Sequence, residues 1–224
     1  MPLHEAIARG QASLSEHAAK QFLAGYGIPI PRETVVLNPD AAAAAAARLG
    51  FPVVLKVSGA AVAHKTEIGG VALNLRSAEE VRREGRRLAA LPGCESLLVA
   101  EMVRGNRELA CGLTRDPQFG PCVMFGLGGI LTEALADAVF RIAPLTRLDA
   151  LEMLQEIRGA RLLGPVRGEA AADPEALAAT LVALGRIAMR HPEIRAIDLN
   201  PVTIRPDGAP VAVDALIALA PPPA

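Results

Sequence analysis

The sequence predicts a mixed α/β protein with two lobes. Up to about residue 102, segments with helical hydrophobic spacing alternate with short strand-like runs, whereas the strand-like runs that come next follow one another directly. Of the 224 residues, 51% are hydrophobic, so the chain can bury one or two substantial cores and is not mainly disordered. We therefore expect a smaller lobe over 25–102 and a larger lobe over 103–224, with the N-terminal helix of 1–24 packed on the larger lobe.

Capping residues define the expected helices. Ser13 and Ser77 each stand three positions before a glutamate, and Asn38 followed by proline opens an alanine-rich run. Thr146 and Asp173 occupy the same position in front of two later apolar-periodic segments. The predicted helices cover about 14–24, 41–47, 77–91, 146–157 and 173–189.

Short apolar runs bounded by glycine or proline define the expected strands. In the first half of the chain these strands alternate with helices, and in the second half they follow one another closely. This difference separates the two predicted lobes. The predicted strands cover 33–37, 52–57, 70–75, 96–102, 107–115, 120–126, 139–143, 194–199, 202–204 and 211–213.

Composition excludes several classes of protein. The formal net charge is −1, which gives no bulk attraction to nucleic acid or to an anionic membrane, and only 3% of residues are aromatic. The three cysteines form no CxxC pair, and the N-terminus lacks the apolar core of a signal peptide. We expect a cytoplasmic protein that binds neither nucleic acid nor membrane.

Two cationic or nucleophilic positions lie in or after the second strand. Lys56 ends that strand, where it could contact a phosphate or simply reach solvent. His64 lies in a loop that also holds a lysine, a threonine, a glutamate and two adjacent glycines. Paired glycines permit close approach of the backbone to an anion, and the neighbouring Lys65 disfavours the imidazolium form of His64. These features indicate a functional loop.

Glycines and carboxylates mark the next candidate positions. Gly128 and Gly129 follow a strand and precede a short predicted helix that contains Glu133. They could approach a phosphate or form a tight turn; the sequence contains no P-loop and no complete dinucleotide fingerprint. Glu101 and Glu108 stand at strand ends on either side of a candidate hinge that includes Val103. Each carboxylate could accept hydrogen bonds from a ribose or be a solvated strand end.

A third group of polar side chains lies near the C-terminus. Asp198 and Asn200 occur at the end of one strand, and Asp214 closes the next. Such oxygen ligands suit Mg²⁺, which needs only one or two protein carboxylates when phosphate and water complete its octahedral shell. An Asp-x-Asn-Pro run is equally compatible with an Asx turn.

Together these segments resemble the ATP-grasp β-subunit of ADP-forming acyl-CoA synthetases (acetate–CoA ligases), relatives of the succinyl-CoA synthetase β-subunits. The resemblance runs from about Ser13 to Asp214, and its most specific parts are His64-Lys65-Thr66-Glu67 and the run from Arg115 to Gly120. It implies an ATP-grasp fold in which the nucleotide binds between the two lobes. The other matching segments are 14–16, 26–29, 54–56, 68–71, 101–103, 126–129, 144–146, 166–168 and 198–201.

The resemblance also implies roles for individual residues. His64 matches the histidine that relays a phosphoryl group between the nucleotide and a phosphohistidine of the α-subunit, and Asp198 would lie in the same phosphoryl site. Asn200 and Asp214 match the family's Mg²⁺ ligands. The nucleotide ATP or ADP would be held by Lys56, Glu101, Val103, Glu108, Gly128 and Gly129.

The chain has no room for CoA-binding and CoA-ligase domains beside the two lobes. The resemblance therefore implies an α-subunit that carries those domains, in an α2β2 hetero-oligomer that converts acid, CoA and ATP into acyl-CoA, ADP and phosphate. Two alternatives remain at this stage. One is an independent ATP-grasp ligase acting through an acyl phosphate, which would not need His64, and the other is a nucleotide-sensing subunit without catalysis.

Overall fold

The computed structural model describes residues 2–59, 68–129 and 136–220, and it divides into two compact units. The larger unit comprises Met1–Ile30 and Val103–Ala224, and the smaller unit is Pro31–Met102. Residues 25–30, which the sequence prediction placed in the smaller lobe, belong to the larger unit. The predicted helix that contains Glu133 lies outside the described residues.

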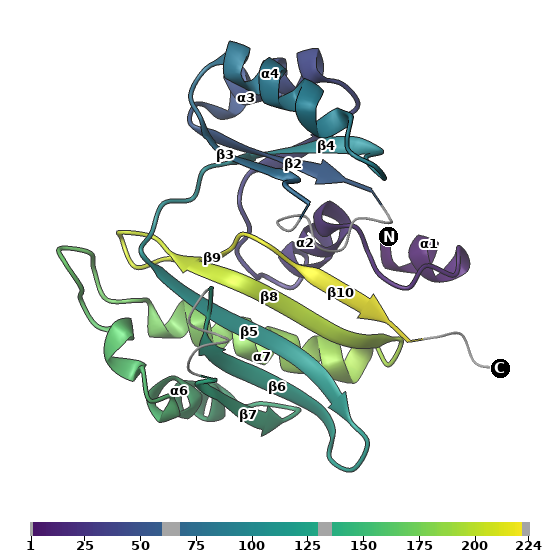
Figure 1. Cartoon of the computed structure of the whole chain (residues 1–224). Coiled ribbons are helices and arrows are strands. Elements are labelled where there is room, and N and C mark those ends of the chain that lie inside the picture. Colours follow the sequence, from purple (N-terminus) through teal and green to yellow (C-terminus); the bar gives the residue numbers. More distant parts are fainter. Residues whose placement is uncertain (1, 60–67, 130–135, 221–224) are drawn as a thin grey trace. The chain divides into compact units, whose positions relative to one another are not determined.

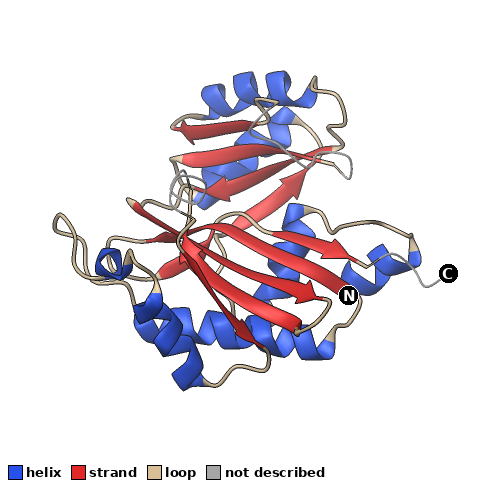
Figure 2. Ribbon diagram, turned by 60° about the horizontal axis from the view of Figure 1, so that its bottom comes forward, coloured by secondary structure: helices blue, strands red, loops and turns tan. Residues whose placement is uncertain are grey.

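The smaller unit is a four-stranded antiparallel sheet with two helices. The strand order is β1-β4-β2-β3, and Figure 2 shows the helices of this unit gathered on one face of its sheet. The side chains of Val53, Leu55 and Val57 meet buried alanines of the first helix in one core. The elements are β1 (Glu33–Val36), α3 (Pro39–Leu49), β2 (Val53–Ser58), β3 (Val71–Leu75), α4 (Ala78–Ala89) and β4 (Ser96–Glu101).

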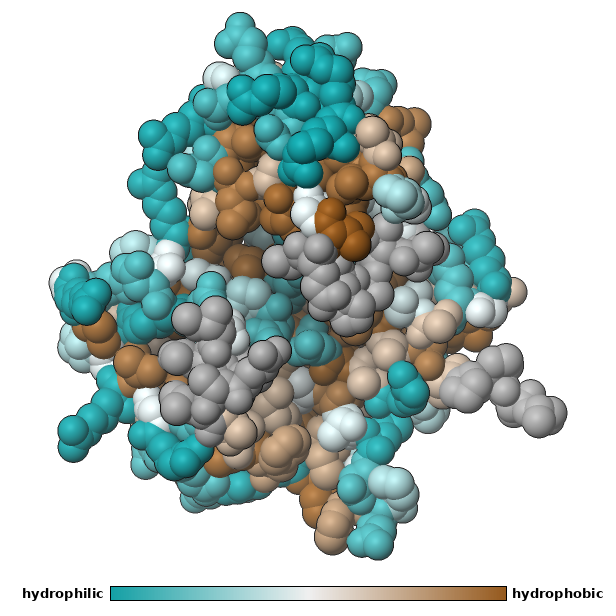
Figure 3. Space-filling model, in the orientation of Figure 1, coloured by the Kyte–Doolittle hydropathy of each residue, from teal (hydrophilic) through white to brown (hydrophobic). Residues whose placement is uncertain are grey.

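Both helices of this unit begin where the sequence predicted. The Asn38 side chain accepts a hydrogen bond from the Ala41 amide over 2.8 Å, and the Ser77 hydroxyl accepts one from the Glu80 amide over 3.2 Å. Charged residues cover the outer side of α4, so the surface over this helix is mostly hydrophilic (Figure 3).

The larger unit is built on a six-stranded antiparallel sheet. Its strand order is β10-β8-β5-β6-β7, with β9 paired to β8, and α7 lies along one face (Figure 1). The large core lies between this face and the helices. The elements are α1 (Pro2–Ala8), α2 (Glu16–Ala24), β5 (Arg107–Asp116), β6 (Gly120–Leu127), β7 (Ala138–Ile142), α6 (Arg147–Glu156), a 3-10 helix (Ala160–Leu163), α7 (Pro174–Arg190), β8 (Ile194–Ile204), β9 (Pro210–Ala212) and β10 (Leu216–Leu219).

The N-terminal region differs from the prediction at its cap. Ser15, not Ser13, caps α2, because the Ser15 hydroxyl accepts from the Ala18 amide while Ser13 forms a β-bridge with Ala218. The apolar side of α2 contributes Leu23 to the large core. The N-terminal helix therefore packs within the larger unit.

Three further differences lie in the larger unit. The short helix α1 and the strand β10 were not predicted, and the two strands expected at 194–199 and 202–204 form one strand, β8. The register with β5 shifts opposite Asn200 and Pro201, because proline has no N–H for the ladder and is tolerated at a bulge. Among the described residues, no helix is both long and apolar enough to cross a membrane.

Candidate active site

The predicted site residues are divided between the two units. Lys56 and Glu101 lie in the smaller unit, and His64 lies outside the described residues. The remaining candidates lie in the larger unit, and they are Val103, Glu108, Gly128, Gly129, Asp198, Asn200 and Asp214.

Lys56 lies in the middle of the four-stranded sheet. It pairs with Val71 on one side and with Leu98 on the other, and only 8% of its surface is exposed. Its neighbours Leu55 and Val57 point into the core beneath the helices, so the alternation of side chains along a strand places Lys56 on the opposite face. The side chain of Lys56 is therefore buried on the face of this sheet that carries no helix.

Glu101 points the other way. It pairs with Val53, in the same register that pairs Lys56 with Leu98, so its side chain lies on the helical face. Arg32 holds its carboxylate, since the Arg32 amide donates to Oε1 over 3.1 Å and the Arg32 Nε donates to Oε2 over 2.9 Å. The carboxylate is therefore engaged inside the smaller unit, and a contact of this residue with a nucleotide would come from its backbone atoms.

In the larger unit, the sheet brings Glu108 to the two predicted glycines. The amide of Gly128 donates to the carbonyl oxygen of Glu108 over 2.8 Å. The amide of Gly129 donates to Asn200 Oδ1 over 3.0 Å. A Cβ atom built on Gly129 would come within 1.9 Å of Glu108 Oε2, so the carboxylate packs directly over this glycine.

These contacts change the expected role of the glycines. Their amides were expected to point at phosphate, but in the structure both donate to protein oxygens. At Gly128, a Cβ would lie 2.4 Å from the carbonyl oxygen of Leu109, and Gly129 has φ +60°, in the left-handed region. Close packing against backbone therefore requires glycine at position 128, whereas the left-handed backbone favours glycine at position 129, where the amide orients the Asn200 amide oxygen.

Asp198 lies on the face of the large sheet opposite the helices. It pairs with Gly112, while its neighbours Ile197 and Leu199 point into the core. The Asp198 residue as a whole is exposed at this face, yet protein atoms around its carboxyl withdraw it partly from water, which raises its pKa, and the Asp214 carboxylate raises the pKa further.

Cys111, on the neighbouring strand, pairs with Leu199 and belongs to the core on the other face of the sheet. Burial raises the pKa of the Cys111 thiol to about 12, and the Asp198 charge adds to the effect. At neutral pH the thiol is protonated, so Cys111 acts as a core residue rather than as a nucleophile.

Asp214 lies in the connection between β9 and β10. The Val213 amide donates to the carbonyl oxygen of Pro201 over 3.2 Å, and two residues after Asp214 the chain pairs Leu216 with Asp198. The connection is thus attached to β8 on both sides of Asp214. This attachment brings the Asp214 carboxylate close enough to Asp198 to influence its pKa.

The donor set suits Mg²⁺. Asn200 and Asp214 offer amide and carboxylate oxygens, and the amide oxygen of Asn200 has a second lone pair beyond the one that accepts from Gly129. Among the described residues, no cluster of three or more His, Cys, Asp and Glu side chains could hold a metal by itself. Asn200 and Asp214 thus offer only oxygen donors, the type of ligand that Mg²⁺ prefers.

Two polar features beside these residues were not predicted. Arg107, next to Glu108, is buried and donates to the carbonyl oxygens of Gly164 over 2.9 Å and Ala170 over 2.5 Å. Lys20 is fully buried and pairs with Glu16 over 2.7 Å. The Glu-x-x-x-Lys spacing on a helix otherwise apolar on that side was a signal in the sequence for the second feature.

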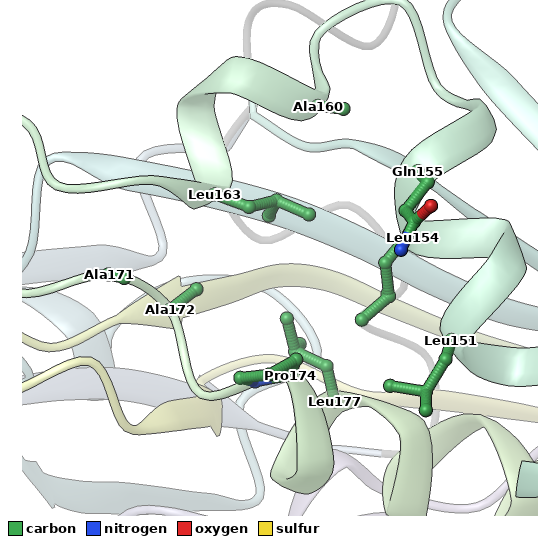
Figure 4. Close-up of a pocket in the computed structure, with 9 residues that line it drawn as sticks. All are labelled: Leu151, Leu154, Gln155, Ala160, Leu163, Ala171, Ala172, Pro174 and Leu177. Atoms are coloured by element: carbon green, nitrogen blue, oxygen red, sulfur yellow. The ribbon is translucent and has the colours of Figure 1, made fainter.

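An apolar pocket in the same unit is separate from these residues. It has a volume of about 370 Å³ and opens between α6, the 3-10 helix and the start of α7. Figure 4 shows Leu154, Leu163 and Leu177 projecting into it. None of the described candidate residues lines this pocket.

The fold and the site define a class of protein. The smaller antiparallel sheet carries a buried lysine, and the larger one carries Asp198 with the Asp214 carboxylate close to it. The sequence matches the model of the ATP-grasp domain over residues 5–219. This match confirms the fold that the motifs predicted.

Individual relatives narrow the class. The chain is 41% identical over 213 residues to acetate–CoA ligase (ADP-forming) I subunit beta of Pyrococcus furiosus, covering 92% of this chain and 91% of the relative. It is also 41% identical to acetate–CoA ligase (ADP-forming) I of Archaeoglobus fulgidus, over 83% of this chain but 28% of that longer protein. The chain therefore belongs to the ATP-grasp family of ADP-forming acetate–CoA ligase β subunits, which confirms the resemblance.

A solved structure agrees with this family. It is that of the dinucleotide-forming acetyl-coenzyme A synthetase 1 of Ca. Korarchaeum cryptofilum, and it covers 98% of both chains with a TM-score of 0.86 and 44% identity. That structure holds coenzyme A and Mg-AMPPCP, and its phosphohistidine segment points towards the nucleotide-binding site.

Proposed function

We propose that this chain is the nucleotide-binding β subunit of an ADP-forming acyl-CoA synthetase, which interconverts acid, CoA and ATP with acyl-CoA, ADP and phosphate. The observation that carries the proposal lies on strand β8, where Gly129 orients the amide oxygen of Asn200 and where the Asp214 carboxylate is close enough to Asp198 to raise its pKa. The 41% identity to a β subunit over nearly its full length supports it.

The polar residues near β8 would take different parts in phosphoryl transfer. That reaction depends mainly on positioning and on neutralising phosphate charge. Asn200 and Asp214 would hold Mg²⁺, which when bound neutralises the negative charge of the phosphates. Asp198 completes the phosphoryl site beside them, and Glu108 supports the turn at Gly129 by packing over it.

The smaller unit and the hinge would hold the rest of the nucleotide. Lys56 projects from a helix-free sheet face, where its ammonium group can neutralise a phosphate. Because Arg32 already holds the Glu101 carboxylate, we assign the hinge contacts with the adenine to backbone atoms of Glu101 and Val103.

His64 would carry the phosphoryl group. One imidazole nitrogen attacks the terminal phosphorus of ATP, an N–P bond forms, the P–O bond to ADP breaks, and ADP leaves with the electron pair. The phosphoryl group then passes to a histidine of the partner subunit. The same sequence in reverse makes ATP.

The partner would be an α-subunit with CoA-binding and CoA-ligase domains, in an α2β2 assembly. The longer relative from Archaeoglobus fulgidus supports this proposal, because the match to this chain covers only 28% of that protein and leaves room there for further domains. We also place the protein in the cytoplasm, because its three cysteines are free thiols and two of them are buried.

The first experiment incubates the purified chain with γ-labelled ATP and Mg²⁺. We expect a label on the protein that is labile in acid and stable in base, as phosphohistidine is, and that disappears in His64→Ala. His4→Ala is the matched control, since His4 is an exposed histidine of α1 and should keep the label.

Two results would contradict the proposal. A label that persists in His64→Ala would place the phosphoryl group elsewhere. Failure to form ADP with any α-subunit, CoA and a panel of carboxylic acids would remove the chain from this reaction altogether.

A further inference from the structure

A fully buried ion pair lies in α2, on the N-terminal segment of the larger unit. The Lys20 ammonium donates to Glu16 Oε1 over 2.7 Å, and the exposed fractions of the two side chains are 0% and 2%. The same ammonium donates to the carbonyl oxygen of Val213 over 3.3 Å. Val213 immediately precedes Asp214, so this lysine contacts the backbone that carries a candidate Mg²⁺ ligand.

The contact is one of several between the N-terminal segment and the chain around Asp214. Before Asp214, the Ala212 amide donates to the carbonyl oxygen of Pro29 over 2.9 Å. After it, the Leu14 amide donates to the carbonyl oxygen of Ile217 over 3.0 Å. The Lys20 bond falls between these two, and β8 holds the connection from its other side through Pro201 and the pairing of Asp198. Asp214 is therefore held between β8 and the N-terminal segment.

The ion pair is a costly way to stabilise a helix. Removing two charges from water is expensive, and a buried pair can often be replaced by apolar residues of similar volume without loss of stability. The lysine of this pair donates to the Val213 carbonyl oxygen, so the pair also contacts the backbone immediately before Asp214.

We propose that Lys20, with Glu16 as its counter-ion, is a positioning residue that sets the Asp214 carboxylate for Mg²⁺ and the nucleotide phosphates. This inference rests on the proposed function. Lys20 contacts no substrate in this role. It acts through the Val213 carbonyl, and Glu16 holds the ammonium group in place.

The test removes the whole pair, because the single variant Lys20→Met would leave Glu16 buried without its counter-ion and lower stability. The double variant Glu16→Leu with Lys20→Met should keep a thermal unfolding midpoint close to that of the wild type. Calorimetry then measures AMPPCP affinity with Mg²⁺ and with EDTA. We expect the affinity in Mg²⁺ to fall about tenfold or more, as when groups that support metal ligands are removed, while the affinity in EDTA stays at its wild-type value.

A matched control removes another ion pair of the same unit. Arg141 of β7 and Glu156 of α6 form a salt bridge, and β7 is the edge strand of the six-stranded sheet opposite β10. The variant Arg141→Met with Glu156→Leu should keep the wild-type affinity in both conditions.

Each other outcome decides against the inference. Unchanged affinity of the Glu16/Lys20 double variant in Mg²⁺ would show that Asp214 needs no such support. An equal loss in Mg²⁺ and in EDTA would reduce the pair to a purely structural role. If the wild type itself binds AMPPCP no better with Mg²⁺ than with EDTA, the proposed function fails, and that result is seen without any variant.

Discussion

The backbone N–H of Gly129 donates a hydrogen bond to Asn200 Oδ1 over 3.0 Å, which joins two residues 71 positions apart in the sequence. The bond determines which end of the Asn200 amide faces Gly129, because only the oxygen can accept. It leaves the second lone pair of that oxygen for a cation. Gly129, which the sequence predicted to approach a phosphate, thus orients Asn200, which the sequence predicted to be a metal ligand.

Replacement of Gly129 by alanine should disturb this arrangement. The backbone there has φ +60°, which costs an L-residue roughly 1–2 kcal/mol, and the new Cβ would meet the Glu108 carboxylate at 1.9 Å unless that side chain moves. We expect Gly129→Ala to be less stable than the wild type and to bind AMPPCP more weakly in Mg²⁺. Thermal unfolding and calorimetry measure the two effects.

The variant Gly10→Ala separates the effect of backbone strain from the effect of the contact with Glu108. Gly10 has a similar φ of +63°, and no atom lies within 4 Å of a Cβ built there. This variant should lose comparable stability and keep its affinity for AMPPCP. Equal loss of affinity in both variants would assign the effect to general destabilisation instead of to the site.

Local chemistry made most of the fold predictable. Asn38, Ser77, Thr146 and Asp173 cap helices where the sequence indicated, because a cap depends on only three or four consecutive residues. Ser13 failed as a cap because its backbone pairs with Ala218, at the other end of the chain. The strand β10 was missed for the same reason, since it is stabilised by its distant partner β8.

The sequence predicted which residues are candidates for the site, but it did not predict their hydrogen-bond partners. Motifs identified Glu101 and Gly129, but whether a carboxylate or an amide is already engaged depends on partners far along the chain. Glu101 is held by Arg32, 69 positions away, and Gly129 by Asn200. Lys20 was missed because its importance arises only from a contact with Val213, 193 positions away.

Lys56 should contribute to nucleotide binding. Methionine can fill the same buried volume on the sheet face while removing the charge. We expect Lys56→Met to lose about tenfold or more in AMPPCP affinity, which corresponds to one charge-assisted hydrogen bond, and thermal unfolding checks that the variant is folded. Arg83→Met, on the exposed side of α4, removes the same charge from the unit and should bind as the wild type does. Unchanged affinity of Lys56→Met would exclude this lysine as a phosphate ligand.

Asp214 should act on nucleotide binding only through the metal. Asparagine keeps an oxygen that can accept from the Ala215 amide, as Asp214 Oδ1 does over 2.8 Å, but it lacks the negative charge that attracts Mg²⁺. In a Mg²⁺ titration at fixed AMPPCP, we expect Asp214→Asn to need a higher Mg²⁺ concentration for half-saturation. With EDTA the variant and the wild type should bind alike. A titration curve that coincides with that of the wild type would show that Asp214 is not a ligand.

The raised pKa of Asp198 predicts how stability without metal depends on pH. Burial and the Asp214 charge raise this pKa, so the folded protein holds the proton more tightly than the unfolded chain does. The ionised carboxylate therefore opposes folding above its folded pKa, and the opposition fades as pH falls towards the ordinary value of about 3.9. In EDTA, Asp198→Asn should unfold at a higher temperature than the wild type at pH 7, with a difference that shrinks towards pH 4.

Asp116 should show the opposite effect on stability, because the Phe119 and Gln118 amides lower its pKa and its ionised form stabilises the fold. Asp116→Asn should therefore unfold at a lower temperature at pH 7, and a pH-independent gain in Asp198→Asn would refute the electrostatic cause.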